Sequence, residues 1–86
     1  MTVKTVIHKR AVKALSRMQP RQSAAIRVAI RAVADNPQAP KADVSRLHGL
    51  NALRVRVGDW RVIIKIEDDV LYVTRIRPRG DVYKRK

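Results

Sequence analysis

Four arginines and a tyrosine in the C-terminal half of the chain have side chains suited to chemistry on a phosphate group. They are Arg54, Arg56, Arg61, Arg77 and Tyr83. The planar guanidinium of arginine binds phosphate oxygens through two parallel hydrogen bonds, and an aromatic ring stacks on an unpaired base. RNA can be cut without a metal when a protein aligns the 2′-hydroxyl with the phosphorus and neutralises the developing charge. Spacing and composition indicate nucleic-acid binding more strongly than cleavage.

The overall charge indicates the same class of partner. The 86 residues include 20 Lys and Arg against 7 Asp and Glu, which gives a net charge of +13. Such an excess suits either nucleic acid, whose counterions are released on binding, or an acidic protein. The chain has no cysteine, which excludes disulfides and thiolate metal sites. We expect no metal and no cofactor.

The length predicts one domain, residues 1–86. No apolar run approaches the roughly 18 residues that a membrane span needs. The apolar stretch at the N-terminus is too short for a signal peptide. We therefore expect a cytoplasmic protein that does not enter a membrane.

The N-terminal half has the pattern of a strand followed by two helices. Residues 3–8 are rich in β-branched types, which predicts a strand. Residues 9–18 and 20–34 have apolar side chains at helical spacing, with Pro20 suited to the first turn of the second helix. Asp35-Asn36-Pro37 ends it, and the pair resembles a helical hairpin. The apolar positions are Ala11, Val12, Leu15, Met18, Ile26, Ala29, Ile30 and Val33.

After a mostly polar connection at 37–49, the sequence alternates with a period of two. Gly58-Asp59 is typical of a two-residue hairpin turn. Such a turn pairs Val57 with Trp60, Val55 with Val62 and Leu53 with Ile64, so one face of the hairpin is apolar. The opposite face receives Arg54, Arg56, Arg61 and Lys65, with Ile63 among them.

The pattern of residues 70–77 predicts the last strand, and two registers are possible for it. A two-residue loop sends Arg75 and Arg77 to the apolar face. A three-residue loop at 67–69 sends Tyr72, Thr74 and Ile76 there instead and puts Arg75 and Arg77 beside Arg61. We prefer this register because burying two unpaired arginines is costly. The predicted fold class is α+β in the order β-α-α-β-β-β, with the helical hairpin packed on a small antiparallel sheet.

Three stretches of the chain resemble the RelE/ParE toxin superfamily. The run Leu53–Ile63 is similar to the hairpin of that family, and Arg77–Tyr83 is similar to its C-terminal motif. Leu47-His48-Gly49-Leu50 resembles the lead-in to the hairpin, with His48 where lysine is usual. The resemblance implies a type II toxin. RelE-like members enter the ribosomal A site and cut messenger RNA there without a metal, leaving a cyclic phosphate.

The resemblance also implies roles for single residues. Arg61 matches the arginine that stabilises the scissile phosphate, Arg77 the arginine assigned to the leaving group, and Tyr83 the tyrosine that stacks on the message. Because Pro78 follows Arg77 directly, Arg79 is an alternative for the second role. The expected RNA-binding residues are Arg54, Arg56, Lys65, Arg75 and Arg79.

The general base is the point at which this sequence departs from the family. Arg54 and Arg56 stand at positions that are often lysine, and arginine does not lose its proton near neutral pH. Lys65 is the only lysine expected on the basic sheet face. The general base is therefore Lys65 or Tyr83, or the protein supplies none. His8 and His48 are interpreted as structural or solvated, because neither is expected on that face.

Two other functions fit the same fold. A ParE-like toxin would bind and poison DNA gyrase, and a non-catalytic basic module would bind nucleic acid or act as a co-repressor. The family implies an antitoxin, and we expect its acidic amphipathic segment to cover the basic face or the groove of the helical hairpin. Further expected partners are the ribosome with its messenger RNA, and operator DNA bound through the antitoxin complex.

Overall fold

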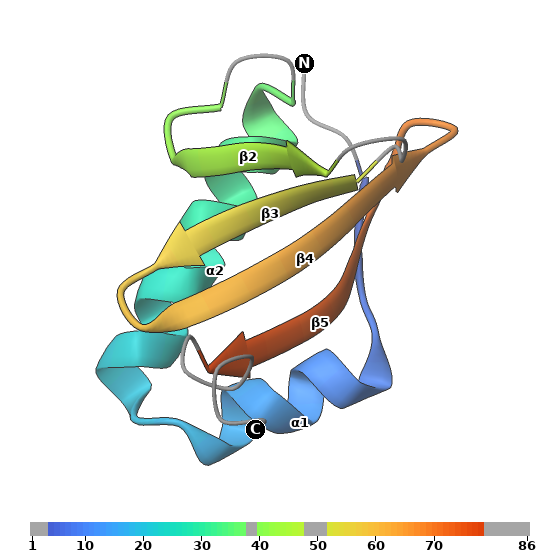
Figure 1. Cartoon of the computed structure of the whole chain (residues 1–86). Coiled ribbons are helices and arrows are strands. Elements are labelled where there is room, and N and C mark those ends of the chain that lie inside the picture. Colours follow the sequence, from blue (N-terminus) through green and yellow to red (C-terminus); the bar gives the residue numbers. More distant parts are fainter. Residues whose placement is uncertain (1–3, 38–39, 48–51, 79–86) are drawn as a thin grey trace, which may run out of the picture.

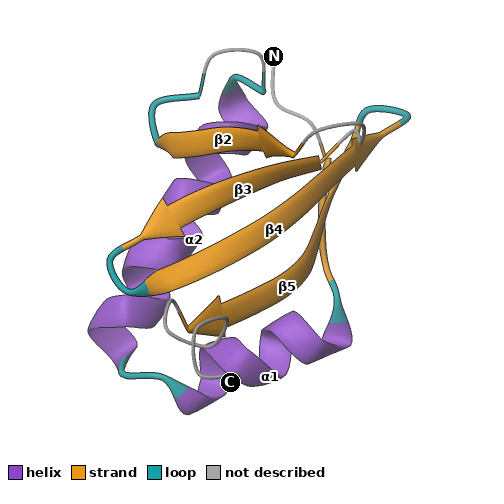
Figure 2. Ribbon diagram, in the orientation of Figure 1, coloured by secondary structure: helices purple, strands orange, loops and turns teal. Residues whose placement is uncertain are grey.

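One mixed sheet carries both helices on a single face. The computed structural model describes residues 4–37, 40–47 and 52–78. The elements are β1 (Lys4–Ile7), α1 (Lys9–Arg17), α2 (Pro20–Asp35), β2 (Asp43–Leu47), β3 (Ala52–Val57), β4 (Trp60–Glu67) and β5 (Val70–Pro78). The strand order is β1-β5-β4-β3-β2, with β1 parallel to β5 and the other pairs antiparallel (Figures 1 and 2). The predicted α+β class is confirmed.

The junction between β1 and α1 is organised by His8. Its backbone N–H donates to the carbonyl of Val73 at 2.9 Å, and its Nδ1 accepts from the backbone N–H of Arg10 at 3.3 Å. His8 is therefore the N-cap of α1 and satisfies a donor that the helix cannot use. Ala11 and Leu15 follow on the buried side of the helix, whereas Val12, predicted on the apolar stripe, is 47% exposed.

The second helix begins and ends as its sequence predicts. Pro20 occupies the first turn, where its missing N–H costs nothing, and the backbone N–H of Asn36 bonds to the carbonyl of Ala32 at the other end. Ile26 and Ile30, four residues apart, are buried on the sheet side. The two helices lie on different strands, α1 on β5 and α2 on β3, and join through one shared core.

The predicted polar connection at 37–49 contains a strand that sequence reasoning missed. Strand β2 pairs antiparallel with β3 and forms an edge of the sheet. Its side chains are exposed or only half-buried, so the alternation is too short and too polar to predict a strand. The sheet is therefore five-stranded and mixed, rather than small and antiparallel.

The hairpin of β3 and β4 has the predicted register. Val57 pairs with Trp60, Val55 with Val62, and Leu53 with Ile64. Gly58 in the turn has a φ of 58°, a left-handed conformation that glycine adopts without a steric penalty.

The register between β4 and β5 corrects the predicted three-residue loop. The turn has two residues, Asp68 and Asp69, both left-handed with φ of 52° and 63°. Ile64 pairs with Val73 and Ile63 with Arg75, so Thr74 is an extra residue in β5, a β-bulge. Its hydroxyl donates to the carbonyl of Ile63 at 3.1 Å.

The bulge places every side chain of β5 on a suitable face. Before it, Leu71 and Val73 are fully buried, and Tyr72 lies on the opposite face, contrary to the prediction for Tyr72 and Thr74. After it, Ile76 is buried and Arg77 pairs with Arg61, as predicted.

The core lies between the sheet and the two helices. Its largest fully buried side chains are Ile26, Val33, Val55, Val62, Ile64, Leu71 and Val73. No buried charged or polar side chain is found in the described part of the chain. None of the helices there combines the length and hydropathy needed to cross a membrane.

Candidate nucleic-acid interface

Three arginines lie side by side across the sheet face opposite α1 and α2, here called the basic face. Arg56 on β3 pairs directly with Arg61 on β4, and Arg61 pairs directly with Arg77 on β5. Directly opposed residues have Cβ atoms about 4.5–5.5 Å apart. We call Arg56, Arg61 and Arg77 the arginine row. Three like charges at this spacing destabilise a sheet, so the arrangement suits a polyanionic ligand.

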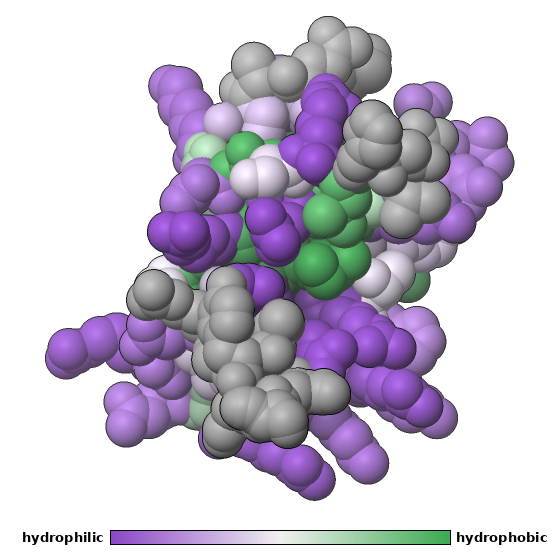
Figure 3. Space-filling view, in the orientation of Figure 1, coloured by the Kyte–Doolittle hydropathy of each residue, from purple (hydrophilic) through white to green (hydrophobic). Residues whose placement is uncertain are grey.

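Further cations continue the basic face along the same strands. The next row places Arg54 and Arg75 on either side of Ile63, and the row beyond it pairs Lys65 with Tyr72. Arg56, Lys65, Arg75 and Arg77 are exposed, and Arg54 and Arg61 are half-buried. In Figure 3, which views this face, hydrophilic groups surround a smaller apolar area.

Two exposed ion pairs on this face are weak. Arg56 Nε lies 3.9 Å from Asp43 Oδ2, and both side chains are 65% exposed. Lys65 Nζ lies 3.9 Å from Glu67 Oε1, with side chains 54% and 57% exposed. Exposed pairs of this kind contribute about 0–1 kcal/mol, so a phosphate can displace the carboxylates.

A small polar pocket lies beside the arginine row. It has a volume of about 60 Å³ and is lined by Asp43, Ser45, Arg54, Arg56 and Arg61. Two of its residues come from β2, the strand that the sequence did not reveal. The pocket therefore brings Arg61 together with two further guanidinium groups, a set able to hold one phosphate group from several sides.

The structure brings most of the predicted site residues to one face. Arg54, Arg56, Arg61, Lys65, Arg75 and Arg77 all lie there. Tyr83 and Arg79 fall outside the described residues, as does His48 with the rest of the lead-in beyond Leu47. The two arginines predicted to act on the phosphate, Arg61 and Arg77, are direct cross-strand neighbours.

Lys65 lies apart from the arginine row. It is four residues from Arg61 on β4, which corresponds to about 13 Å along a strand. A general base must come within about 2.6–3.2 Å of the proton it removes. This separation argues against Lys65 as the base for a phosphate held by Arg61.

Sequence reasoning missed a second pocket on the basic face. It has a volume of about 250 Å³ and is lined by Val6, His8, Lys65, Glu67, Tyr72 and Thr74. His8, which was not expected on this face, therefore lies at its border. The pocket was missed because the predicted three-residue loop placed Tyr72 on the apolar face, whereas the two-residue turn at Asp68-Asp69 pairs it with Lys65.

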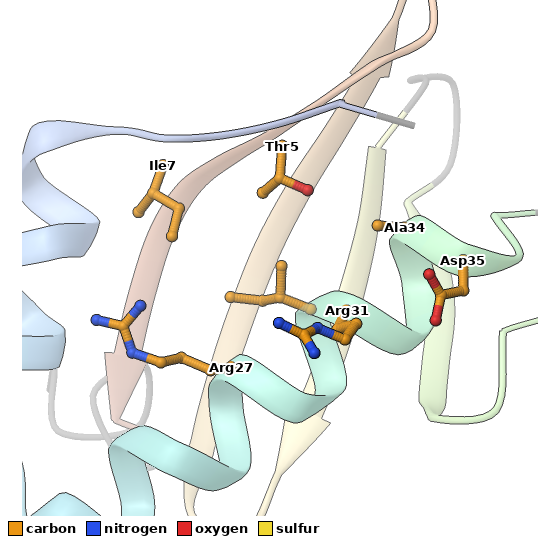
Figure 4. A pocket seen from close by; sticks show the side chains of 7 residues that line it. Thr5, Ile7, Arg27, Arg31, Ala34 and Asp35 are labelled. Atoms are coloured by element: carbon orange, nitrogen blue, oxygen red, sulfur yellow. The ribbon is translucent and has the colours of Figure 1, made fainter. Parts of the chain in front are cut away.

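A larger groove lies on the helix side of the sheet, between α2 and β1 (Figure 4). Its volume is about 580 Å³, and its lining residues are Thr5, Ile7, Arg27, Ile30, Arg31, Ala34 and Asp35. In Figure 4 the side chains of Arg27 and Arg31 lie between α2 and the residues of β1. Its lining combines apolar side chains with two arginines and one aspartate.

Comparison with known protein families identifies a match over most of the chain. The profile of a family described as "ParE toxin of type II toxin-antitoxin system, parDE" matches residues 6–83. Among the described residues, no three His, Asp or Glu side chains are grouped to hold a metal ion. No curated protein sequence matches the chain significantly.

Solved structures of RelE proteins share the fold. The archaeal RelE-RelB complex from Pyrococcus horikoshii OT3 has 31% identity and a TM-score of 0.81, covering 94% of this chain and 99% of that one. The RelB-RelE complex from Methanococcus jannaschii has 23% identity and a TM-score of 0.75, covering 94% and 98%. The isolated E. coli RelE toxin has 16% identity and a TM-score of 0.76, covering 94% and 90%. The chain belongs to the RelE/ParE superfamily of type II toxin–antitoxin toxins.

Proposed function

We propose that this toxin is a ribosome-dependent endonuclease that cuts messenger RNA. The observation that carries the proposal is the arginine row, in which Arg61 and Arg77 are direct neighbours on the basic face. A similar chain with 31% identity is described as an archaeal RelE. A face that gathers guanidinium groups around one point suits a phosphate whose negative charge increases during the reaction.

In this mechanism the RNA supplies its own nucleophile. The 2′-oxygen attacks the adjacent phosphorus, the bond from phosphorus to the 5′-oxygen breaks, and a 2′,3′-cyclic phosphate remains. Arg61 neutralises the phosphate oxygens, and Arg77 stabilises the departing 5′-oxygen until it gains a proton. The proton of the 2′-hydroxyl passes to water or to a group outside the arginine row, because a guanidinium cannot accept it.

The test is a primer-extension map of a reporter message after the toxin is induced alone. Wild type is expected to cut in frame within translated codons. Arg61→Ala should reduce cutting about 100- to 1000-fold, as removal of one charge-stabilising donor does in other enzymes. Arg31→Ala, which removes the same charge from the helix side, is the matched control and should cut normally. Full cutting by Arg61→Ala at equal expression would refute the site.

The family profile gives a reason to keep a second function. The matching family is described as ParE toxins, which favours inhibition of DNA gyrase as the alternative. Growth arrest with an intact reporter message, together with loss of gyrase supercoiling activity, would establish this alternative. Neither arrest nor cutting would favour a non-catalytic basic module or a co-repressor.

We also propose an antitoxin as the partner that silences the toxin. Two of the similar structures named above are RelB–RelE complexes. An acidic amphipathic segment suits either the basic face or the groove between α2 and β1. Competition with RNA separates the two surfaces: a segment on the basic face displaces RNA, and a segment in the groove does not. A salt-insensitive complex would contradict the electrostatic contribution.

A further inference from the structure

The pocket around Tyr72 lies on the same face as the arginine row and about 13 Å from it along the strands. Arg75 lies between the pocket and the arginine row, on the same face and two residues before Arg77. A single RNA strand whose phosphates follow these cations would therefore reach the pocket within a few nucleotides of the phosphate at Arg61. With a volume of about 250 Å³, the pocket has room for one planar ring.

We propose that this pocket binds one unpaired base of the RNA and selects which base is accepted. The proposal deepens the endonuclease function proposed above and depends on it for its role in cutting. The direct neighbours Lys65, Tyr72 and Val6 form a row across β4, β5 and β1, three strands that lie side by side (Figure 1). The ring of Tyr72 offers the stacking surface that single-stranded RNA requires.

Hydrogen-bonding groups surround this stacking surface. The hydroxyl of Thr74 donates to the carbonyl of Ile63, so its oxygen is fixed in place as an acceptor. Nδ1 of His8 accepts from the N–H of Arg10, so the proton of the neutral ring is on Nε2, which is a donor. The pocket can therefore read both donors and acceptors on the edge of a base.

The charged residues of the pocket favour bases with an exocyclic amine. Lys65 and Glu67 pair only loosely, at 3.9 Å and with more than half of each side chain exposed. The Glu67 carboxylate can accept from an amine, as acidic side chains accept from cytosine, while the Lys65 ammonium meets a ring nitrogen or carbonyl. Uracil has no exocyclic amine, so we expect it to bind more weakly than adenine or cytosine.

The first experiment titrates the full chain with single nucleotides and follows ring protons by NMR. The chain has only two histidines and two tyrosines, so the signals of His8 and Tyr72 are readily assigned from variants. Adenosine 5′-monophosphate should shift both rings and bind more tightly than uridine 5′-monophosphate. Inorganic phosphate should not reproduce the shifts at Tyr72, because it cannot stack.

Variants at the stacking residue separate a base from a general anion. Tyr72→Leu keeps apolar cover but removes the aromatic ring, and should weaken adenosine 5′-monophosphate binding by about 5- to 150-fold. Tyr72→Phe should keep the affinity, and Arg31→Ala, the charge control on the helix side, should leave it unchanged. Equal affinity of Tyr72→Leu and wild type would overturn the pocket, as would equal shifts with phosphate. Should Tyr72→Leu not fold, Lys65→Ala at an exposed position must still weaken binding, or the proposal fails.

The reporter map distinguishes failure of the pocket from failure of the proposed function. Tyr72→Leu should still cut in frame, but with a changed base preference at a fixed distance from the cut. An unchanged distribution of cuts would overturn the selecting role while the endonuclease function stands. A wild type that binds nucleotides through Tyr72 but makes no cuts would refute the endonuclease and leave the base pocket in place.

Discussion

The two faces of strands β3 and β4 carry opposite kinds of side chain. On the helix side, Val55, Val62 and Ile64 are fully removed from water and pack with both helices. On the basic face, one residue away from Val55 and Val62, Arg56 and Arg61 stand opposite each other. The difference teaches that one face supplies the stability of this small domain, which leaves the other free to hold charges that repel each other.

The β-bulge is the feature that lets β5 serve both faces. If Thr74 instead took a regular paired position on β5, with Leu71 and Val73 on the inside, Arg75 and Arg77 would lie inside as well, because successive side chains alternate. Thr74 takes up one position without a partner, so Ile76 is buried and Arg77 joins the arginine row. The core and the candidate site are thus built by one irregularity.

The largest expected effect is on the free energy of unfolding, and two neighbouring isoleucines that lie on opposite faces of β4 test it. Ile64→Ala should lower the free energy of unfolding by about 2–5 kcal/mol, because it leaves a cavity in a small core. Ile63→Ala, on the basic face, is the matched control and should cost about 1 kcal/mol or less. Urea denaturation followed by the fluorescence of Trp60 measures both. Equal losses would mean that the two faces do not differ as described.

A smaller effect is expected when the bulge is removed. Deleting Thr74 should keep Ile76 inside and Arg77 beside Arg61, because the bulge residue has no partner on β4. The loss should be about 0.5–1.5 kcal/mol, the value of its one hydrogen bond to Ile63. Deleting Tyr72 instead is the control and should cost more, since it disrupts the pairing with Lys65. Unfolding of the Thr74 deletion would contradict this register.

The smallest expected effect concerns repulsion within the arginine row. Arg61→Gln removes the central charge between Arg56 and Arg77, so the free energy of unfolding should rise by up to about 1 kcal/mol at low salt. The gain should shrink as salt is added, because exposed charges are screened. A variant that is clearly less stable than wild type at low salt would show that the row is not under repulsion.

Much of the fold could be predicted because local patterns specify it. Pro20 begins α2, and Gly58-Asp59 sets a hairpin whose register follows directly from alternating apolar residues. Strand β2 was not predicted because its side chains show almost no apolar alternation. It is stabilised by pairing with β3. His8 was assigned no place on the basic face because its position depends on β1 lying beside β5.

By itself the sequence determined the basic character of the protein, its hairpin and the shared face of Arg54, Arg56, Arg61 and Lys65, since each of these follows from charge or from a period of two. The sequence also predicted Arg77 beside Arg61, but only the tertiary structure decided that Tyr72 shares this face with Arg77. That decision depends on a single unpaired residue, Thr74, and the alternation of a strand gives no sign of where its register will slip.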